Sequence, residues 1–157
     1  MIPCTTMHYV TGTWTMAAGN VAGTIAMSKA AAAETAVINI PILVPSNSVA
    51  LKGSYIKSIE IDYEILTAAA TSITASMNKV TRGADTVGLT VASVPVTQDL
   101  AAGVAAATVA KHKLIVTITT PIWILNTEYH LLVLTLVAAT TTAFKLNSAV
   151  VNFTERI

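Results

Sequence analysis

The stretch SYIKSIEIDYEIL, Ser54 to Leu66, decides the fold class of this chain. From its fifth residue on, apolar side chains alternate strictly with polar ones: Ile59, Ile61, Tyr63 and Ile65 against Ser58, Glu60, Asp62 and Glu64. Successive side chains of a β-strand point to opposite faces, so a period of two indicates a strand with one buried face. The stretch therefore predicts a half-buried strand.

The next segment, Ser72 to Arg82, alternates in the same way. A short loop would join the two strands as an antiparallel hairpin, with Ile65 opposite Ile73 and Ile61 opposite Met77. In that register apolar residues lie opposite apolar ones and polar residues opposite polar ones. We therefore expect a hairpin within one sheet.

Strand patterns continue along the whole chain. Val, Ile and Thr make up 56 of the 157 residues, and β-branched side chains favour strands. The nearly continuous apolar run Glu128 to Ala138 predicts a central strand covered on both faces, and Pro41 and Pro95 indicate edges or bulges. The remaining predicted strands are Gly12–Ala17, Val21–Met27, Ala36–Val44, Val87–Thr97, Lys111–Thr120 and Phe144–Thr154.

This pattern predicts an all-β protein. We expect an antiparallel β-sandwich of eight or nine strands, jelly-roll-like, in a single domain over residues 1–157. Residues 1–11 are expected to form an extended N-terminal arm.

The composition makes the surface of a lone subunit difficult to build. Apolar residues account for 54% of the chain and charged residues for only 11%. A monomer of 16.3 kDa exposes roughly 7,500 Å², which so few charged side chains cannot cover. Large exposed apolar patches usually mark interfaces. We therefore expect other copies of the chain, or a partner, to cover part of the surface.

The charge balance disfavours two classes of partner. Nine Lys or Arg residues and eight Asp or Glu residues give a net charge of +1 with no basic block, so we expect no direct contact with nucleic acid. The apolar runs are much shorter than the about 20 residues of a membrane-spanning helix, so we expect no membrane span. Cys4 is the single cysteine and cannot form a disulfide within the chain.

Few residues suggest chemistry. Glu60, Asp62 and Glu64 share one face of the first predicted strand, so they are weak candidates for a cation site. We favour the interpretation that this is a solvated outer face, or that the acids form salt bridges to Lys from a neighbour. The three histidines lie far apart in sequence, and no nucleotide-binding or hydrolase motif is present. We therefore predict no enzyme activity and no cofactor.

The aromatic residues are too few to define a binding surface by themselves. Trp14, Trp123 and Tyr129 are candidates for a platform on which a sugar could stack, but in a chain with so few aromatic residues we favour core or subunit-interface anchors.

The chain resembles the small structural proteins of tailed phages and other virions in its Ala-, Thr- and Val-rich, charge-poor, all-β character. The phrases that carry the resemblance are GSYIKSIEIDYEI (Gly53 to Ile65), NKVTRGADTVGLTV (Asn78 to Val91) and VVNFTERI (Val150 to Ile157). The resemblance implies a self-assembling subunit in the virion, such as a decoration, head-fibre, tail or capsid component. It also implies a symmetric homo-oligomer, for example a trimer, bound to a capsid or other structural lattice.

Two other classes of function remain open at this point. A secreted carbohydrate-binding or adhesin-type module would be extracellular and would expose an aromatic platform. A hydrolase would need a pocket that joins an acid or a histidine to a second titratable group.

Overall fold

The predicted strand Ser54 to Leu66 is β6 (Gly53–Ile65), and it lies in the middle of the larger of two sheets. The computed structural model describes residues 1–44, 53–83, 88–99 and 107–156. Sheet A has the order β3-β4-β12-β6-β10-β9, and β1 pairs with β12 beside it. Its other strands are β1 (Ile2–Pro3), β3 (Trp14–Ala18), β4 (Ile25–Lys29), β9 (Val96–Gln98), β10 (Lys111–Trp123) and β12 (Phe144–Arg156).

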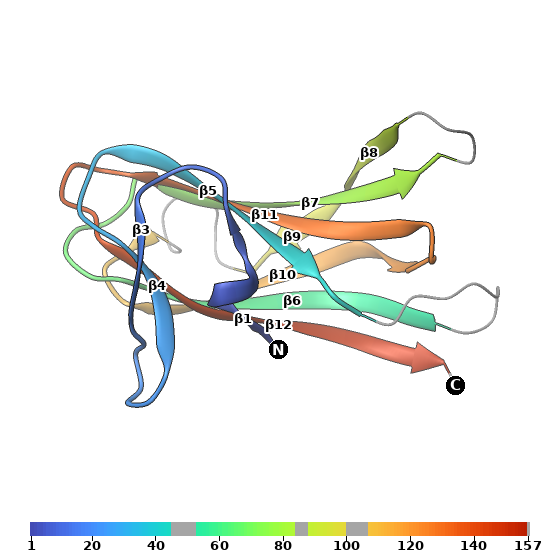
Figure 1. Ribbon diagram of the computed structural model, residues 1–157, viewed down its shortest axis with the longest axis horizontal. Coiled ribbons are helices and arrows are strands. Elements are labelled where there is room, and N and C mark those ends of the chain that lie inside the picture. The colour runs from blue at the N-terminus through green and yellow to red at the C-terminus, as the bar shows by residue number, and fades with distance from the viewer. Residues whose placement is uncertain (45–52, 84–87, 100–106, 157) are drawn as a thin grey trace.

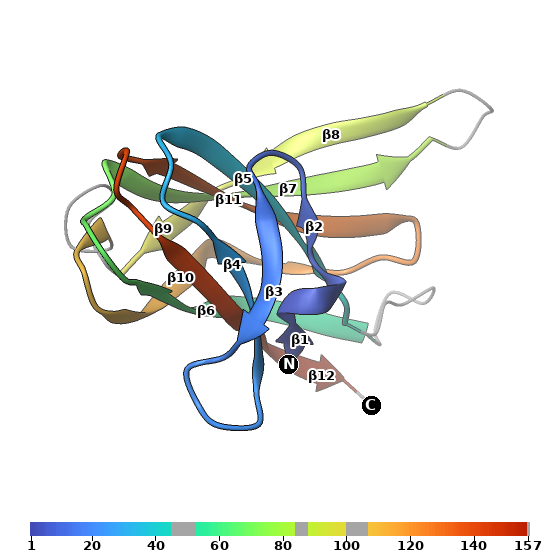
Figure 2. The same ribbon diagram turned by 60° about the vertical axis from the view of Figure 1, so that its left-hand side comes forward.

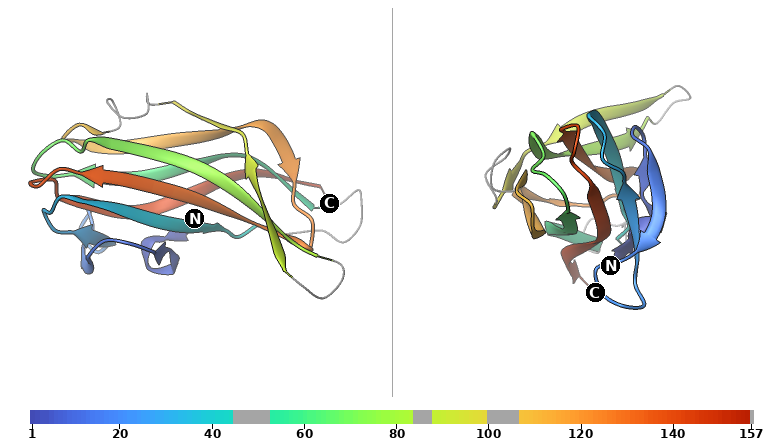
Figure 3. Two further views of the ribbon diagram at one scale, coloured as in Figure 1. Left: turned by 90° about the horizontal axis from the view of Figure 1, so that it is seen from above. Right: turned by 90° about the vertical axis from the view of Figure 1, so that its left-hand side faces the viewer.

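Sheet B has the order β2-β5-β11-β7-β8. Its strands are β2 (His8–Tyr9), β5 (Glu34–Ile42), β7 (Ser72–Arg82), β8 (Leu89–Val94) and β11 (Glu128–Ala138). Figure 1 shows β7 and β11 of this sheet above β6 and β12 of sheet A, and Figure 3 shows β11 between β5 and β7. Every pairing in the described residues is antiparallel.

The strand order is that of a jelly roll, so the predicted fold class is confirmed. Eight strands form two four-stranded layers, β4-β12-β6-β10 and β5-β11-β7-β8, and the chain passes repeatedly from one layer to the other. The short strands β1, β2, β3 and β9 are added at the borders of this framework. They bring the number of strands in the described residues to twelve, above the predicted eight or nine.

The predicted hairpin between residues 54 and 82 is wrong. Both strands exist at the predicted positions, but β6 pairs with β10 and β12, whereas β7 pairs with β11 and β8. The loop between them crosses from one sheet to the other, and Leu66, Ala70 and Thr71 donate backbone hydrogen bonds to other segments of the chain. Alternation in the sequence shows which face of a strand is buried, but it does not show which strand it pairs with. Two alternating strands can therefore pack face to face in opposing sheets as well as pair side by side in one sheet.

The core lies between the two sheets. Ile59, Ile61 and Ile65 of β6 are fully buried, as are Leu132, Leu134 and Leu136 of β11. At one end a row of ring contacts starts at Tyr9 of sheet B and continues along sheet A through Trp14, Phe144, Tyr63 and His112, with successive centroids 4.8 to 6.0 Å apart. Apolar burial on this scale is the main force that holds the two sheets together.

Pro41 and Pro95, the two prolines used in the sequence analysis, lie where the pairing between strands is interrupted. Pro41 is in β5 at a position where only β11 pairs with that strand, as expected for an edge. Pro95 separates β8 of sheet B from β9 of sheet A. It therefore marks a crossing between the sheets.

The N-terminal segment connects both sheets. In residues 1–11, expected as an extended arm, β1 pairs with β12 and β2 pairs with β5, with a single 3-10 turn (Cys4–Thr6) between them. Tyr9 Oη donates a 2.7 Å hydrogen bond to the carbonyl of Cys4. The segment is thus attached to the sandwich along its length.

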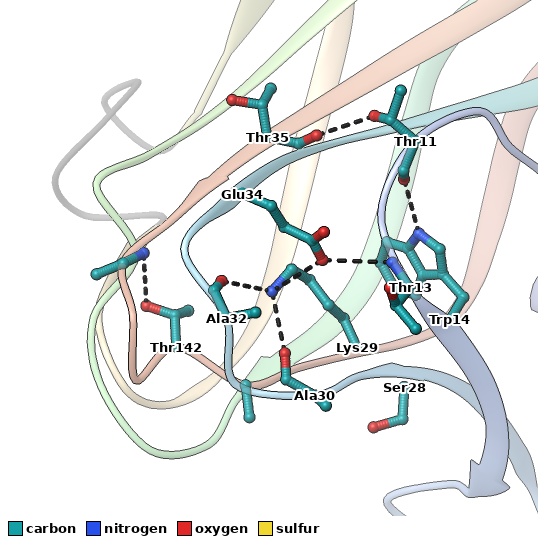
Figure 4. A network of polar contacts seen from close by, with 12 residues as sticks. Thr11, Thr13, Trp14, Ser28, Lys29, Ala30, Ala32, Glu34, Thr35 and Thr142 are labelled. Carbon is teal, nitrogen blue, oxygen red and sulfur yellow. Dashed lines mark hydrogen bonds and ion pairs between the residues drawn. The ribbon is translucent and has the colours of Figure 1, made fainter.

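A buried ion pair holds β4 to the start of β5. The ammonium of Lys29 has no exposed surface, donates hydrogen bonds to the carbonyls of Ala30 and Ala32 at 3.0 and 2.9 Å, and lies 3.2 Å from the carboxylate of Glu34 (Figure 4). Glu34 also accepts a 3.3 Å hydrogen bond from the backbone N–H of Thr13. Because three acceptors surround the ammonium, the buried charge is compensated.

No helix in the described part of the chain has the length and apolar character needed to span a bilayer.

Candidate functional site

The outer faces of the two sheets differ in charge. On sheet A, the outward side chains of β6 include Glu60, Asp62 and Glu64, and the lysines of the neighbouring strands lie opposite them. On sheet B, the alternate residues that face away from the core are listed by strand: Thr35, Val37, Asn39 and Pro41 of β5; Tyr129, Leu131, Val133, Thr135 and Val137 of β11; Ser72, Thr74, Ser76, Asn78 and Val80 of β7; Leu89, Val91 and Ser93 of β8. None of the residues in this list is charged, and we call them the neutral face. Among the described residues of these strands, Arg82 at the end of β7 is the one charged residue on the same side, where it lies opposite Leu89 at the margin.

The acidic triplet predicted from the sequence is flanked by lysines. Lys113 Nζ lies 2.7 Å from Glu60 Oε2, and Asn152 Nδ2 donates a 2.9 Å hydrogen bond to Glu60 Oε1. These two contacts, with Lys113 the larger cause, hold the pKa of Glu60 below its ordinary value, and Glu60 in turn raises the pKa of Lys113. Among the described residues, no cluster of three or more His, Cys, Asp and Glu side chains is placed to hold a metal ion.

The three aromatic candidates do not meet. Trp14 is half-buried, packs against Tyr9 and Phe144, and donates a 3.0 Å hydrogen bond from Nε1 to the carbonyl of Thr11. Trp123 lies on β10 of sheet A and Tyr129 on β11 of sheet B, so these two are in different layers. The structure therefore forms no platform from this set.

Trp123 instead pairs with Tyr55, which the sequence analysis did not single out. The two rings lie on adjacent strands with centroids 5.1 Å apart, and 41% of Trp123 is exposed. The two strands are far apart in sequence, and a register shift between Thr117 and Ile122 sets this pairing. No local signal in the sequence indicates it.

The neutral face is apolar along its centre. On β11, Leu131, Val133 and Val137 are half-buried and Tyr129 is 46% exposed. The expectation that this strand is covered on both faces is therefore wrong within one chain. Its central position is confirmed, because it pairs with β5 on one side and β7 on the other.

The neutral face continues to an open sheet edge. β8 is the last strand of sheet B, with β7 on one side and no partner on the other within the described residues (Figure 2). Its sequence, LTVASV, has no charge and no proline, and Leu89 and Val91 are 59% and 65% exposed. Natural proteins usually protect such edges with lysine, proline or a bulge. β8 has none of these.

The three histidines lie apart. His8 is exposed on β2, and His112 Nε2 donates a 2.8 Å hydrogen bond to the carbonyl of Thr108. His130 is buried on β11, and neither of its ring nitrogens has a hydrogen-bond partner among the described residues. Burial lowers the pKa of His130. Cys4 is a buried free thiol whose pKa is raised by burial. These groups do not form a set of nucleophile, base and acid.

Comparisons with known proteins add little about function. No protein-family model matches the chain, and no curated protein matches its sequence. One similar solved structure is TmCBM61 in complex with β-1,4-galactotriose, with 7% identity and a TM-score of 0.47, over 93% of this chain and 86% of that one. Another contains the CBM22-1 and GH10 modules of Clostridium thermocellum xylanase 10B complexed with xylohexaose, with 12% identity and a TM-score of 0.45. In that case the match covers 99% of this chain but 27% of the other. At these levels of similarity neither structure bears on what this chain binds.

Proposed function

We propose that the chain is a structural subunit that assembles through the neutral face of sheet B and the adjoining edge of β8, as a component of a virion. The observation that carries the proposal is that the outer residues of four adjacent strands are uncharged apart from Arg82 at the margin, and that about half of them, including most of those on the central strand β11, are apolar. Interface centres are depleted of charged residues and enriched in aromatic ones, and Tyr129 lies at one end of this face.

The size of the neutral face suits such a contact. Four strands about 4.8 Å apart, each about nine residues long with a rise of about 3.4 Å, cover roughly 600 Å². A standard interface buries about 800 Å² on each partner, so the face and the β8 edge together supply most of one. Symmetric pairing of β8 with a second β8 would also satisfy its free backbone groups, and no like charges would meet because the strand carries none.

The proposal that assembly takes place in a virion is based on the resemblance in sequence character described above. That the chain is not an enzyme stays a prediction. Flanking genes for capsid or portal proteins would support this location. Their absence, together with a secretion context, would favour an extracellular module.

The test of assembly places a charge at the centre of the neutral face. Val133→Lys puts an ammonium on the middle strand, and Thr117→Lys, on the exposed outer side of β10 in sheet A, is the matched control. We expect the unchanged protein to sediment as an oligomer, Val133→Lys as a monomer, and Thr117→Lys as the unchanged protein does, all with the same circular dichroism. Equal oligomers in all three proteins, or a monomer throughout, would contradict the proposal.

A second function is favoured by one observation, the ring pair of Trp123, which is 41% exposed, and Tyr55, which is half-buried. Aromatic faces bind the C–H faces of sugars, and the polar side chains of Ser58, Glu60 and Asn152 continue from the pair along the same outer face. We propose saccharide binding by this module-like surface as the alternative. Loss of glycan-array binding in Trp123→Ala, with none lost in Tyr129→Ala, would support it.

A further inference from the structure

The edge strand β8 is exposed on both of its faces as well as along its outer edge. It forms the border of sheet B, and no other strand lies beyond it within the described residues (Figure 2). Residues 89–93 are exposed whichever face of the sheet they point to, and only Val94, at the end of the strand, is buried. The edge along residues 89–93 is therefore open to a further strand.

The register with β7 shows which backbone groups of β8 point to this open edge. Arg82 of β7 donates its N–H to the carbonyl of Thr127, next to β11, so the backbone groups of Arg82 point away from β8. Along an antiparallel ladder, opposite residues alternate between hydrogen-bonded and non-hydrogen-bonded pairs. Leu89 lies opposite Arg82 and therefore belongs to a non-hydrogen-bonded pair. The N–H and carbonyl groups of Leu89, Val91 and Ser93 consequently point to the open edge.

Two contacts of other β7 residues agree with this direction. The N–H of Ala75 donates a 2.8 Å hydrogen bond to Gln98 Oε1 of β9, on the side of β7 away from β11. The carbonyl of Thr81 accepts a 3.4 Å hydrogen bond from Thr90 Oγ1 of β8. The odd-numbered residues of β7 thus direct their backbone groups toward β8, and the even-numbered ones direct theirs toward β11.

Backbone groups that point outward at every second residue are what a second copy of the same strand needs for pairing. With Val91 opposite Val91 of the second copy in an antiparallel pair, Leu89 lies opposite Ser93. Each of these pairs then exchanges two hydrogen bonds, about six in all. A register shifted by two residues keeps only two of the three pairs within β8. The backbone therefore favours the register centred on Val91.

The side chains of β8 are compatible with the same register. The strand carries no charge, so no like charges meet across the pair. Arg82 of β7 and its equivalent in the second copy would be three strand spacings apart, about 14 Å. On the outer side Val91 would contact its own copy, and on the inner side Thr90 would lie opposite Ala92. The outer side of the pair would also connect the neutral faces of the two copies.

We propose that β8 pairs antiparallel with β8 of a second copy about a two-fold axis at Val91, and that this pairing joins the two copies of sheet B into one continuous sheet. The proposal rests on the assembly proposed above and defines the contact at its edge. The edge contact alone is much smaller than the about 800 Å² per partner of a standard interface, so it persists only when further copies cover the joined neutral faces. Two-fold pairing predicts an even number of copies rather than a trimer.

The test is disulfide cross-linking between copies under mild oxidation with copper–phenanthroline. Opposite Cα atoms of a hydrogen-bonded antiparallel pair lie about 5.5 Å apart, a separation that a disulfide can span. We expect Val91→Cys to cross-link to its own copy and Ser93→Cys alone to remain uncross-linked. An equal mixture of Leu89→Cys and Ser93→Cys should cross-link. The unchanged protein, whose Cys4 is buried, is the control and should form no cross-link.

A proline variant tests the hydrogen bonds without a cysteine. Val91→Pro removes an N–H that points to the open edge and none that bonds to β7, and proline is tolerated at such edge positions. The circular dichroism should therefore stay unchanged, while self-association measured by sedimentation weakens about tenfold or more. Val91→Thr keeps the N–H and the branched side chain, and it should associate as the unchanged protein does.

The outcomes separate this pairing from assembly through the neutral face, because cross-linking traps even transient pairs. Suppose that the protein assembles and Val133→Lys dissociates it. Absence of the Val91→Cys cross-link, or equal cross-linking of Ser93→Cys alone, would then overturn the β8 pairing and leave assembly through the face in place; an edge that bonds a segment of a different protein would give this result. The expected cross-links, in a protein whose association Val133→Lys does not change, would support the β8 pairing and contradict assembly through the face. A monomer without cross-links would overturn both.

Discussion

The buried ammonium of Lys29 gives the sharpest prediction about stability. Lys29→Met keeps most of the side-chain volume but removes three polar contacts, to Ala30, Ala32 and Glu34. Breaking a buried ion pair by removing one partner costs about 3–5 kcal/mol. Because the Glu34 side chain is 27% exposed and can regain water when Lys29 is lost, we expect the lower end, about 3 kcal/mol.

The assay is urea unfolding at a fixed protein concentration, followed by circular dichroism, with the variants Lys29→Met, Glu34→Gln and the double variant. Glu34→Gln keeps an acceptor beside Lys29, so we expect a smaller loss of about 1–2 kcal/mol. The double variant should lose less than the sum, because the two side chains interact directly. A Lys29→Met protein within about 0.5 kcal/mol of the unchanged one, the range of ordinary surface substitutions, would refute the reasoning.

Three further predictions follow from the same structure. Ile61→Asp should abolish folding, because it places an unpaired carboxylate in the fully buried core of β6; a cooperative unfolding transition in this variant would be inconsistent with the sheet arrangement. Burial holds the pKa of His130 below 6.5, so the free energy of unfolding is highest above about pH 6.5 and falls as the pH drops toward the lowered pKa. In His130→Leu the urea midpoint should therefore depend less on pH in that window. Because the pKa of Glu60 is lowered, its carboxylate should contribute to stability above about pH 4.5, and this contribution should be lost on further acidification. Lys113→Ala should make the contribution smaller. Urea midpoints measured between about pH 3 and pH 6 would show the difference.

The strands were predictable from sequence because their signal is local. Residues 59 to 65 alternate strictly, and β6 and β7 begin and end within a few residues of the predicted positions. The partners of each strand were not predictable in the same way. Ile61 lies opposite Leu114 and Ala149 in its own sheet, and both partners are more than fifty residues away along the chain.

The site was less predictable than the fold. Salt bridges between the acidic triplet and lysines were expected from the sequence. The contact of Asn152 with Glu60 and the pairing of Tyr55 with Trp123 were not, because both depend on register shifts in β10 and β12. Bulges follow from how neighbouring strands fit together, so a single alternating segment contains no sign of them.

Composition nevertheless pointed to the neutral face before its position was known. Too few charged residues for a complete surface predicted an uncharged region, and the apolar run at Glu128 to Ala138 contains its central part. That run is apolar on both sides although only one side faces the core of the chain. A second cover from outside the chain is the simplest physical reason for such a strand.

Hydroxyl-radical footprinting of the purified protein tests this account most directly, because two aromatic side chains provide an internal comparison. Tyr129 on the neutral face is 46% exposed in a single subunit and Trp123 on sheet A is 41% exposed. Assembly through sheet B predicts that Tyr129 is protected at high protein concentration and becomes reactive on dilution or in Val133→Lys, while Trp123 stays reactive throughout. Strong labelling of Tyr129 at every concentration would show that water, and no second molecule, covers the neutral face.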